Sequence, residues 1–310
     1  MMKVAVTGAT GMLGSHVVKQ FADAGYEIVP VTRQEVDLTN AVETLRFFNE
    51  LSVDGVVHCA ARVGGIQANI EGGSSFLLDN LAIDNAVIDA ARETNVQNFL
   101  YIGSSCVYPA NRQEALEVDD ILTGPIEPTN ANYGLAKIVG AKKVEAISST
   151  TGRNWRTFVA SNLYGPNDHF NSNKSHLVAS VISKVLKAKE EGAKQIEMWG
   201  DGLPLREFTY VEDFAKWISN QFPRLQHFPP IMNVGYGKDF SVQAYYEMVL
   251  DVCGYNAEIR ADISKPSGNS RKLMDSSVAR QFGWVPETEI KAGLAKTVEW
   301  VLSRNEMRSR

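Results

Sequence analysis

Three side chains in the middle of the sequence have the types and spacing to reduce a carbonyl group. Ser104 follows the apolar run 98–102, and Tyr133 and Lys137 follow later, four residues apart. That spacing places the tyrosine and the lysine on one face of a helix. Tyrosine can donate a proton to a carbonyl oxygen, and a neighbouring ammonium would lower its pKa from the usual value of about 10. Because this spacing also occurs by chance, the interpretation depends on the surrounding sequence.

A glycine turn near the N-terminus is the first such observation. The apolar run 3–7 reads as a buried strand, three glycines follow it, and a helix is expected over 12–24. Glycines in such a turn let backbone N–H groups approach a pyrophosphate at the start of a helix. The strand before and the helix after therefore predict a dinucleotide site. Its residues are Gly8, Thr10, Gly11, Met12, Leu13 and Gly14.

The residues after the second expected strand, 27–31, distinguish between the two nicotinamide cofactors. A site for NAD favours an acidic residue there, which binds the ribose 2′-hydroxyl. This sequence has Arg33 instead, whose charge suits a 2′-phosphate, although a solvated surface arginine is the alternative. Asp37 follows and is expected near the adenine. The sequence therefore predicts NADP as the cofactor.

The alternation of strand and helix patterns predicts an α/β fold, a Rossmann-type doubly wound parallel sheet. Further strands are expected at 55–59, 98–102, 157–160 and 231–234, with long helices at 76–94 and 133–149. His58 lies inside one of these strands and is expected to be a core residue. The alternation stops near residue 166. We therefore expect a first domain of 1–165 with about 207–234, and a smaller C-terminal α/β substrate domain of 166–206 with 235–310.

Composition limits the partners of this chain. Of the 310 residues, 44% are hydrophobic and 22% charged, and the net charge is −5, so no general attraction to nucleic acid is expected. No apolar run reaches the roughly 18 residues that span a bilayer, and no signal peptide or membrane segment is expected. The three cysteines have neither metal-ligand nor disulfide spacing, which favours a reducing, cytoplasmic setting and no metal.

Seven segments together resemble the extended short-chain dehydrogenase/reductases, and most closely the GDP-L-fucose synthases among them. The glycine turn and the Tyr/Lys pair specify only the superfamily. The Val-Gly-Gly-Ile loop, the Ser-Ser-Cys triplet and a later histidine are specific to the narrower family. The matching segments are 60–69, 103–109, 127–130, 133–137, 162–166, 175–176 and 206–208.

The resemblance implies two sets of catalytic residues. Ser104, Tyr133 and Lys137 would form the reductase triad. Cys106 would remove protons from C3 and C5 of a sugar, and His176 would return them on the opposite face. Both carbons flank a C4 ketone, and inversion requires two opposed acid/base groups. A thiol becomes a competent base near cations, while a buried packing cysteine and a helix-start histidine are the plain alternatives.

Binding residues follow from the same resemblance. The cofactor would also contact Ala60, Lys137, Asn162, Leu163 and His176. Arg206 and Lys265 would hold the diphosphate of a GDP-sugar, and Trp199 would contact its nucleotide. The full set of substrate-binding residues would be Val63, Gly64, Ser105, Lys184, Trp199, Arg206, Lys265 and Arg271, with Lys272 as a further candidate cation. Lys184 stands where the family commonly carries arginine, so one contact there is expected to differ.

The resemblance implies an NADPH-dependent enzyme that epimerises GDP-4-keto-6-deoxy-D-mannose and reduces it at C4 to GDP-L-fucose. The alternatives are a related GDP-keto-sugar reductase, such as a GDP-colitose or GDP-heptose enzyme, and a sensor that binds the cofactor without turnover. The helices at 76–94 and 133–149 carry more apolar surface than one sheet face needs. In the superfamily such helices pair as a four-helix bundle, so a homodimer is expected.

Overall fold

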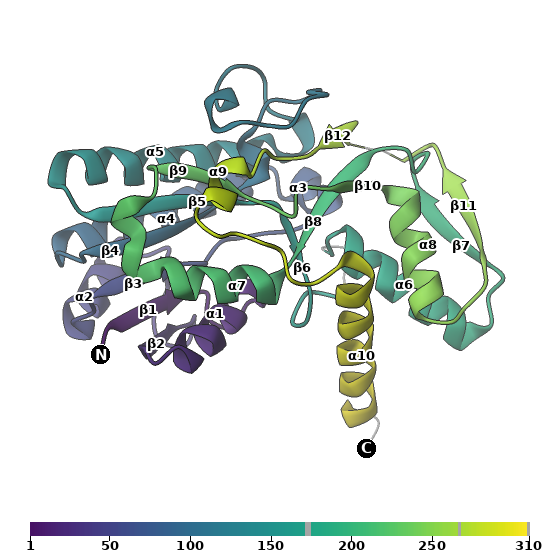
Figure 1. Cartoon of the computed structure of the whole chain (residues 1–310), viewed down its shortest axis with the longest axis horizontal. Coiled ribbons are helices and arrows are strands. Elements are labelled where there is room, and N and C mark those ends of the chain that lie inside the picture. Colours follow the sequence, from purple (N-terminus) through teal and green to yellow (C-terminus); the bar gives the residue numbers. More distant parts are fainter. Residues whose placement is uncertain (171–174, 266–267, 309–310) are drawn as a thin grey trace.

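A six-stranded parallel sheet forms the larger part of the protein (Figure 1). The structure is a computed structural model and describes residues 1–170, 175–265 and 268–308. The strand order is β2-β1-β3-β4-β5-β9. In chain order, these strands are β1 (Lys3–Thr7), β2 (Glu27–Val31), β3 (Gly55–His58), β4 (Asn98–Ser104), β5 (Asn154–Ala160) and β9 (Ile231–Val234).

Helices cover both faces of this sheet, which explains why its strands are apolar almost throughout. On β1, Ala5 packs in one core cluster, while its neighbours Val4 and Val6 pack in the other, as the alternation of side chains along a strand requires. The first cluster lies under α2 (Ala41–Leu51), α4 (Ser74–Glu93) and α5 (Ala131–Thr151). The second lies under α1 (Met12–Asp23) and α7 (Val211–Gln221). The prediction of a Rossmann-type doubly wound sheet is confirmed.

The order of connection defines the ligand-binding edge of the sheet. The chain leaves β1 for β2 on one side and reaches β3 on the other side, so the order of the strands reverses next to β1. Parallel sheets bind ligands outside the carboxyl ends of the strands at such a switch point. The glycine turn after β1 and the residues after β3 and β4 all lie at this edge.

A second set of elements extends from the large sheet (Figure 1). Strand β8 (Leu205–Tyr210) pairs with β6 (Asn162–Tyr164), β10 (Asp239–Ser241) and β12 (Arg271–Lys272). Strands β7 (Gln195–Trp199) and β11 (Glu258–Asp262) form a further pair. A third core cluster packs these strands against the helices α6 (Leu177–Glu191), α8 (Val242–Val252) and α10 (Ile290–Arg308).

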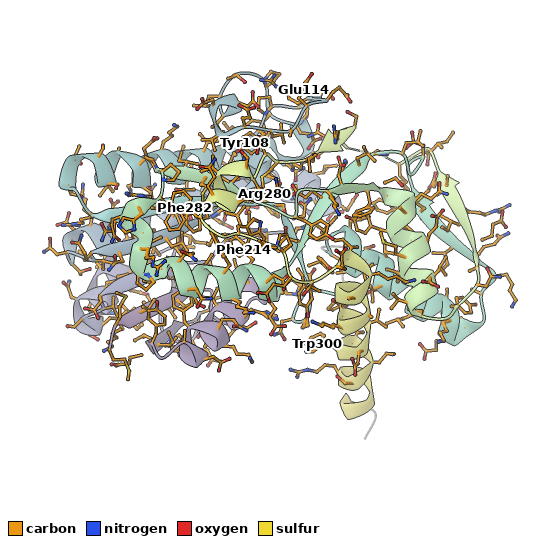
Figure 2. The ribbon with its side chains drawn as sticks, in the orientation of Figure 1. Tyr108, Glu114, Phe214, Arg280, Phe282 and Trp300 are labelled. Atoms are coloured by element: carbon orange, nitrogen blue, oxygen red, sulfur yellow. The ribbon has the colours of Figure 1, made fainter. Side chains whose placement is uncertain are left out.

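The segments of this second set are interleaved with the large sheet. We expected residues from about 207 to re-enter the first domain. Strand β8 pairs with β6, whose residues we had placed in that domain, and with β10 and β12, while α7 packs in a core cluster of the large sheet. Conversely, Ala279 on α9 (Ser277–Gln281) and Trp284 belong to the core cluster of the large sheet, and Phe282 lies on the same side of the sheet as Phe214 (Figure 2). No helix in the described ranges combines the length and apolarity needed to cross a bilayer.

Candidate active site

The glycine turn brings the backbone of β1, α1 and β3 into close contact. Gly8 has φ +65°, and a Cβ there would lie 2.9 Å from backbone atoms of Ala60. A Cβ on Gly14 would lie 2.1 Å from the carbonyl oxygen of Gly8, and the Gly11 N–H donates to the same oxygen over 2.9 Å. Only glycine fits these positions, so the backbone at the start of α1 is left uncovered by side chains. Such a cradle fits a dinucleotide pyrophosphate.

Arg33 and Asp37 lie after β2 at the same edge as this turn. Strands β1 and β2 are parallel and pair Thr7 with Val31, so the segments that follow them emerge side by side. Arg33 is exposed. Hydrogen bonds from Thr39 and the charge of Arg33 hold the pKa of Asp37 below its ordinary value. An exposed cation at this position fits a 2′-phosphate.

Ser104 and Tyr133 meet at the carboxyl end of β4. The Ser104 hydroxyl accepts a hydrogen bond from the Cys106 N–H over 3.2 Å, and its side chain also hydrogen-bonds Tyr133. Gly134 makes this possible, because a Cβ there would lie 2.4 Å from the Cys106 carbonyl oxygen. The start of α5 therefore packs directly on the Ser-Ser-Cys segment.

The environment of Tyr133 differs from the expectation that Lys137 controls its acidity. Burial is the largest influence and raises the pKa of Tyr133, and nearby Cys106 and Asp84 act in the same direction. Lys137 is almost wholly buried, and its ammonium lies 3.7 Å from a carboxylate oxygen of Asp84. Tyr133 therefore keeps its proton at neutral pH and is a potential proton donor.

Lys272 contacts the thiol of Cys106. Its Nζ lies 3.3 Å from the cysteine sulfur, within hydrogen-bonding range. Lys272 pairs in register with Arg206 across β12 and β8, and the Arg206 guanidinium interacts electrostatically with Cys106 and Glu127. The thiol therefore lies beside two positively charged side chains. Sequence reasoning had only weighed Lys272 as a diphosphate ligand, because 166 residues separate it from Cys106.

His176 lies at the N-cap of α6, where its side chain makes no capping hydrogen bond. Burial raises the pKa of Asp168, and His176 opposes that shift through its charge. Within the described residues, the interactions of His176 do not reach Cys106. The opposed pair of Cys106 and His176 therefore stays a prediction.

Trp199 lies between two lysines. The Nζ atoms of Lys184 and Lys265 are 5.5 and 5.4 Å from the centre of its ring, within cation–π range. Lys184 also donates to the Glu197 carbonyl oxygen over 2.9 Å, and burial lowers its pKa. The indole remains 39% exposed. Three residues expected to bind different parts of the substrate thus lie together, with a lysine where arginine is common.

Arg271 is engaged elsewhere. Its guanidinium pairs with Asp239 over 2.6 Å and donates to the Gln113 carbonyl oxygen over 2.7 Å. The bond to Asp239 raises the pKa of Arg271. Consecutive side chains of a strand point to opposite faces, which explains why Lys272 reaches Cys106 and Arg271 does not.

The remaining expected binding residues surround the same edge of the sheet. The Ala60 N–H donates to the Thr7 hydroxyl over 3.1 Å. A Cβ on Gly64 would lie 2.7 Å from Ala68, and Val63 beside it is 44% exposed. Ser105 is buried in the turn after β4, while Asn162 and Leu163 lie in β6.

The fold and this site define an enzyme of the short-chain dehydrogenase/reductase class, with a dinucleotide turn and a Ser-Tyr-Lys set at the edge of a parallel sheet. Comparison with known proteins identifies the family. Residues 4–235 match the model of the NAD dependent epimerase/dehydratase family, and the chain belongs to that family.

Relatives similar over nearly the whole chain refine this placement. A GDP-L-fucose synthase of Azorhizobium caulinodans is 39% identical, covering 98% of each chain. A GDP-L-colitose synthase of Yersinia pseudotuberculosis is 36% identical, covering 97% of this chain and 98% of the relative. Among solved structures, a GDP-6-OMe-4-keto-L-xylo-heptose reductase from C. jejuni superposes with a TM-score of 0.92 at 28% identity, covering 98% of each chain.

Proposed function

We propose that this protein converts GDP-4-keto-6-deoxy-D-mannose to GDP-L-fucose with NADPH, by epimerisation at C3 and C5 followed by reduction at C4. The observation that carries the proposal is the Cys106 thiol, which lies two residues after Ser104 and 3.3 Å from the Lys272 ammonium. A plain reductase needs a proton donor but no such base. The Cys106 thiol lies beside cations and close to Ser104 and Tyr133. One bound sugar could therefore be both epimerised and reduced at this site.

The cradle at Gly8 and Gly14 and the cation Arg33 fit an NADP pyrophosphate and 2′-phosphate. Solved relatives from Campylobacter jejuni and Naegleria fowleri with NADP bound support this choice. When bound, NADPH supplies the hydride that reaches C4. The residues that would hold it are those of the glycine turn, Arg33, Asp37, Ala60, Lys137, Asn162, Leu163 and His176.

The reductase residues act on the C4 oxygen. Ser104 hydrogen-bonds both Tyr133 and the backbone of Cys106, so the tyrosine hydroxyl is fixed beside the place where the ketone binds. As C4 is reduced, the Tyr133 O–H bond breaks and its proton passes to the C4 oxygen. Lys137, one helical turn along α5 from Tyr133, would contact the bound cofactor.

The epimerase residues act on the carbons that flank this ketone. The Cys106 thiolate removes the proton from C3 or C5, and the electron pair enters an enolate that extends to the C4 oxygen. His176 gives a proton to the opposite face. Before the second inversion the Cys106 thiol loses its proton to solvent and His176 takes one up, so no proton is consumed overall. All three cysteines are free, and the need for a free thiol favours a reducing, cytoplasmic setting.

A related keto-sugar remains the second candidate. The GDP-L-colitose synthase relative and the heptose reductase neighbours favour a GDP-4-keto-sugar that is epimerised at one carbon or none. All of these substrates share the GDP group, for which Trp199 with Lys184 and Lys265 is the proposed subsite.

Product NMR separates these candidates. With GDP-4-keto-6-deoxy-D-mannose and NADPH, we expect GDP-L-fucose from the wild type. Cys106→Ser should oxidise NADPH but release a sugar unchanged at C3 and C5. GDP-L-fucose formation at the normal rate by Cys106→Ser would show that the assigned base is wrong. Turnover of a colitose or heptose precursor alone would favour the second candidate.

We also propose that the protein is a homodimer, paired through α4 and α5 as a four-helix bundle. Three apolar side chains on these helices are at least two-fifths exposed, namely Leu78, Leu135 and Val139. Sedimentation at micromolar concentration should give twice the chain mass, and Val139→Asp should shift the protein to monomer. A wild-type monomer would contradict the proposal.

A further inference from the structure

A fully buried chain of polar side chains connects the glycine turn to Lys137. The Thr7 hydroxyl lies 2.6 Å from His58 Nδ1, and His58 Nε2 lies 3.0 Å from Asp84 Oδ1. Tyr101 hydrogen-bonds the other oxygen of Asp84. Side-chain exposure is 0–3% throughout this group. Buried polar networks of this kind are costly unless every member is paired.

One arrangement of protons pairs every group of the network. The Ala60 N–H donates to the Thr7 oxygen, and the Thr7 O–H then donates to His58 Nδ1. A neutral His58 donates from Nε2 to Asp84, and Tyr101 donates from its hydroxyl. Burial lowers the pKa of His58, which agrees with the neutral ring. Asp84 therefore remains an anion that needs one cation, and the ammonium of Lys137 lies 3.7 Å away.

The backbone of α5 is shaped to admit this pair. A Cβ on Gly140 would lie 2.3 Å from the Tyr101 hydroxyl oxygen and 3.1 Å from Asp84 Oδ2. Glycine at this position lets the helix that carries Lys137 approach the network. The Lys137 ammonium also lies 4.4 Å from the centre of the Tyr101 ring. The titratable groups around it are therefore Asp84 on α4, Tyr101 on β4, His58 and Cys59 at the end of β3, and Tyr133 on α5.

We propose that Asp84, oriented by His58 and Tyr101, is a positioning residue that keeps Lys137 charged and fixed beneath the reductase site. The contact of 3.7 Å is an ion pair rather than a short hydrogen bond, so the ammonium keeps its N–H donors for the groups it acts on. Asp84 itself touches no reacting atom. The inference rests on the proposed reductase role of Lys137, but the pairing itself can be tested without substrate.

The activity test uses Asp84→Asn, with Asp89→Asn as the matched control. Asp89 pairs with Lys143 across the same two helices over 2.8 Å, but this pair is only partly buried. We expect kcat of Asp84→Asn to fall about ten- to a hundredfold, with KM for the keto-sugar within about threefold. A buried ammonium without a counter-charge is less favourable, so the alkaline limb of the kcat profile should move to lower pH. The control should keep the wild-type profile, and an unmoved limb in Asp84→Asn would overturn the proposal.

A double-mutant cycle, measured by unfolding, tests the pairing of Asp84 with Lys137 without substrate turnover. Lys137→Met leaves the Asp84 carboxylate buried without its cation, and Asp84→Asn leaves the ammonium without its anion. Each single variant should therefore unfold at a lower denaturant concentration than the wild type. The double variant should unfold above both singles, whereas additive losses would refute the pairing. If the wild type turns over no keto-sugar, the proposed function fails, and this cycle still decides whether Asp84 and Lys137 act as a pair.

Discussion

Two buried carboxylates, Asp84 and Glu207, differ in their acidity. We call Ser104, Tyr133 and Lys137 the reductase half of the site, and Cys106 with its neighbouring cations the epimerase half. Asp84 lies behind the reductase half, within reach of the Lys137 ammonium. Glu207 lies on β8 beside Arg206, and accepts hydrogen bonds from the N–H groups of Gly237 and Met274 over 2.6 and 3.0 Å. Both carboxylates are almost wholly buried, but only Asp84 has a cation at ion-pair distance among the described residues.

The difference appears in their acidity. Burial alone would raise the pKa of Asp84, but Lys137 and the hydrogen bonds of His58 and Tyr101 together hold it below its ordinary value. Burial raises the pKa of Glu207 to about 7, although backbone N–H groups oppose the shift. Two backbone N–H groups therefore do not offset the burial of Glu207, whereas an ammonium together with two side-chain hydrogen bonds offsets that of Asp84. The reductase half rests on a fixed charge pair, while the strand that carries Arg206 holds a carboxyl group that titrates near neutral pH.

The largest expected effect tests the reductase half directly. Tyr133→Phe removes the hydroxyl that donates to the C4 oxygen and keeps the buried ring. We expect kcat for NADPH oxidation with the keto-sugar to fall about 10²- to 10⁴-fold, the usual contribution of a positioned acid. Exchange of the C3 and C5 protons with D₂O should continue, since Cys106 is intact. Tyr255→Phe, which removes a hydroxyl bonded to Ala188, is the control and should keep full activity. Reduction by Tyr133→Phe within about threefold of wild type would assign the donor elsewhere.

Glu207 predicts a stability that changes with pH. Its folded-state pKa is raised from 4.5 to about 7, so its contribution is fully present below about pH 4.5 and is lost as the pH rises through 7. The free energy of unfolding should fall by about 3 kcal/mol over that interval through this group alone. Urea unfolding at about pH 5 and about pH 8 measures the slope, and Glu207→Gln should lack this component. Equal slopes in the two proteins would mean that Glu207 is ionised throughout.

Lys272→Met tests whether the epimerase half needs its cation. Loss of the ammonium 3.3 Å from the sulfur disfavours the thiolate. We expect the exchange of C3 and C5 protons with solvent to slow about ten- to a hundredfold, a cost of about 1.4–2.7 kcal/mol. Lys291→Met, which breaks an exposed pair with Asp251, is the matched control. If exchange is unchanged while KM for the GDP-sugar rises, Lys272 binds the diphosphate instead, as the sequence had suggested.

The sequence predicted the large sheet well because each of its signals is local. The apolar runs of β1, β2 and β9 began and ended at the predicted residues. Helix α5 begins two residues before Tyr133, because the turn around Pro128 and Asn130 leads straight into it. The placement of β8 was not predictable in this way, since its pairing partners lie far apart in the sequence.

The same distinction between local signals and long-range contacts applies to the residues of the site. Ser104 and Tyr133 are joined by a strand end and a helix start, both visible as motifs. The contact of Lys272 with Cys106 and the pair of Lys137 with Asp84 depend on tertiary packing, and neither spacing is a helical or strand repeat. The sequence did not single out Asp84, because the segment 81–91 also contains Asn85 and Asp89.

The smallest expected effect concerns Trp199. The lysines beside it lie near the surface, unlike the buried pair of Asp84 and Lys137. Trp199→Ala removes the ring between Lys184 and Lys265, so the two ammonium groups lose the surface that holds them. We expect KM for the GDP-sugar to rise about 5- to 30-fold, or about 1–2 kcal/mol, with kcat within about twofold. Trp199→Phe keeps an aromatic face and should recover most of the affinity. Because Asp84→Asn is expected to act on kcat and Trp199→Ala on KM, a fall in kcat for Trp199→Ala would show that the two regions are not separate.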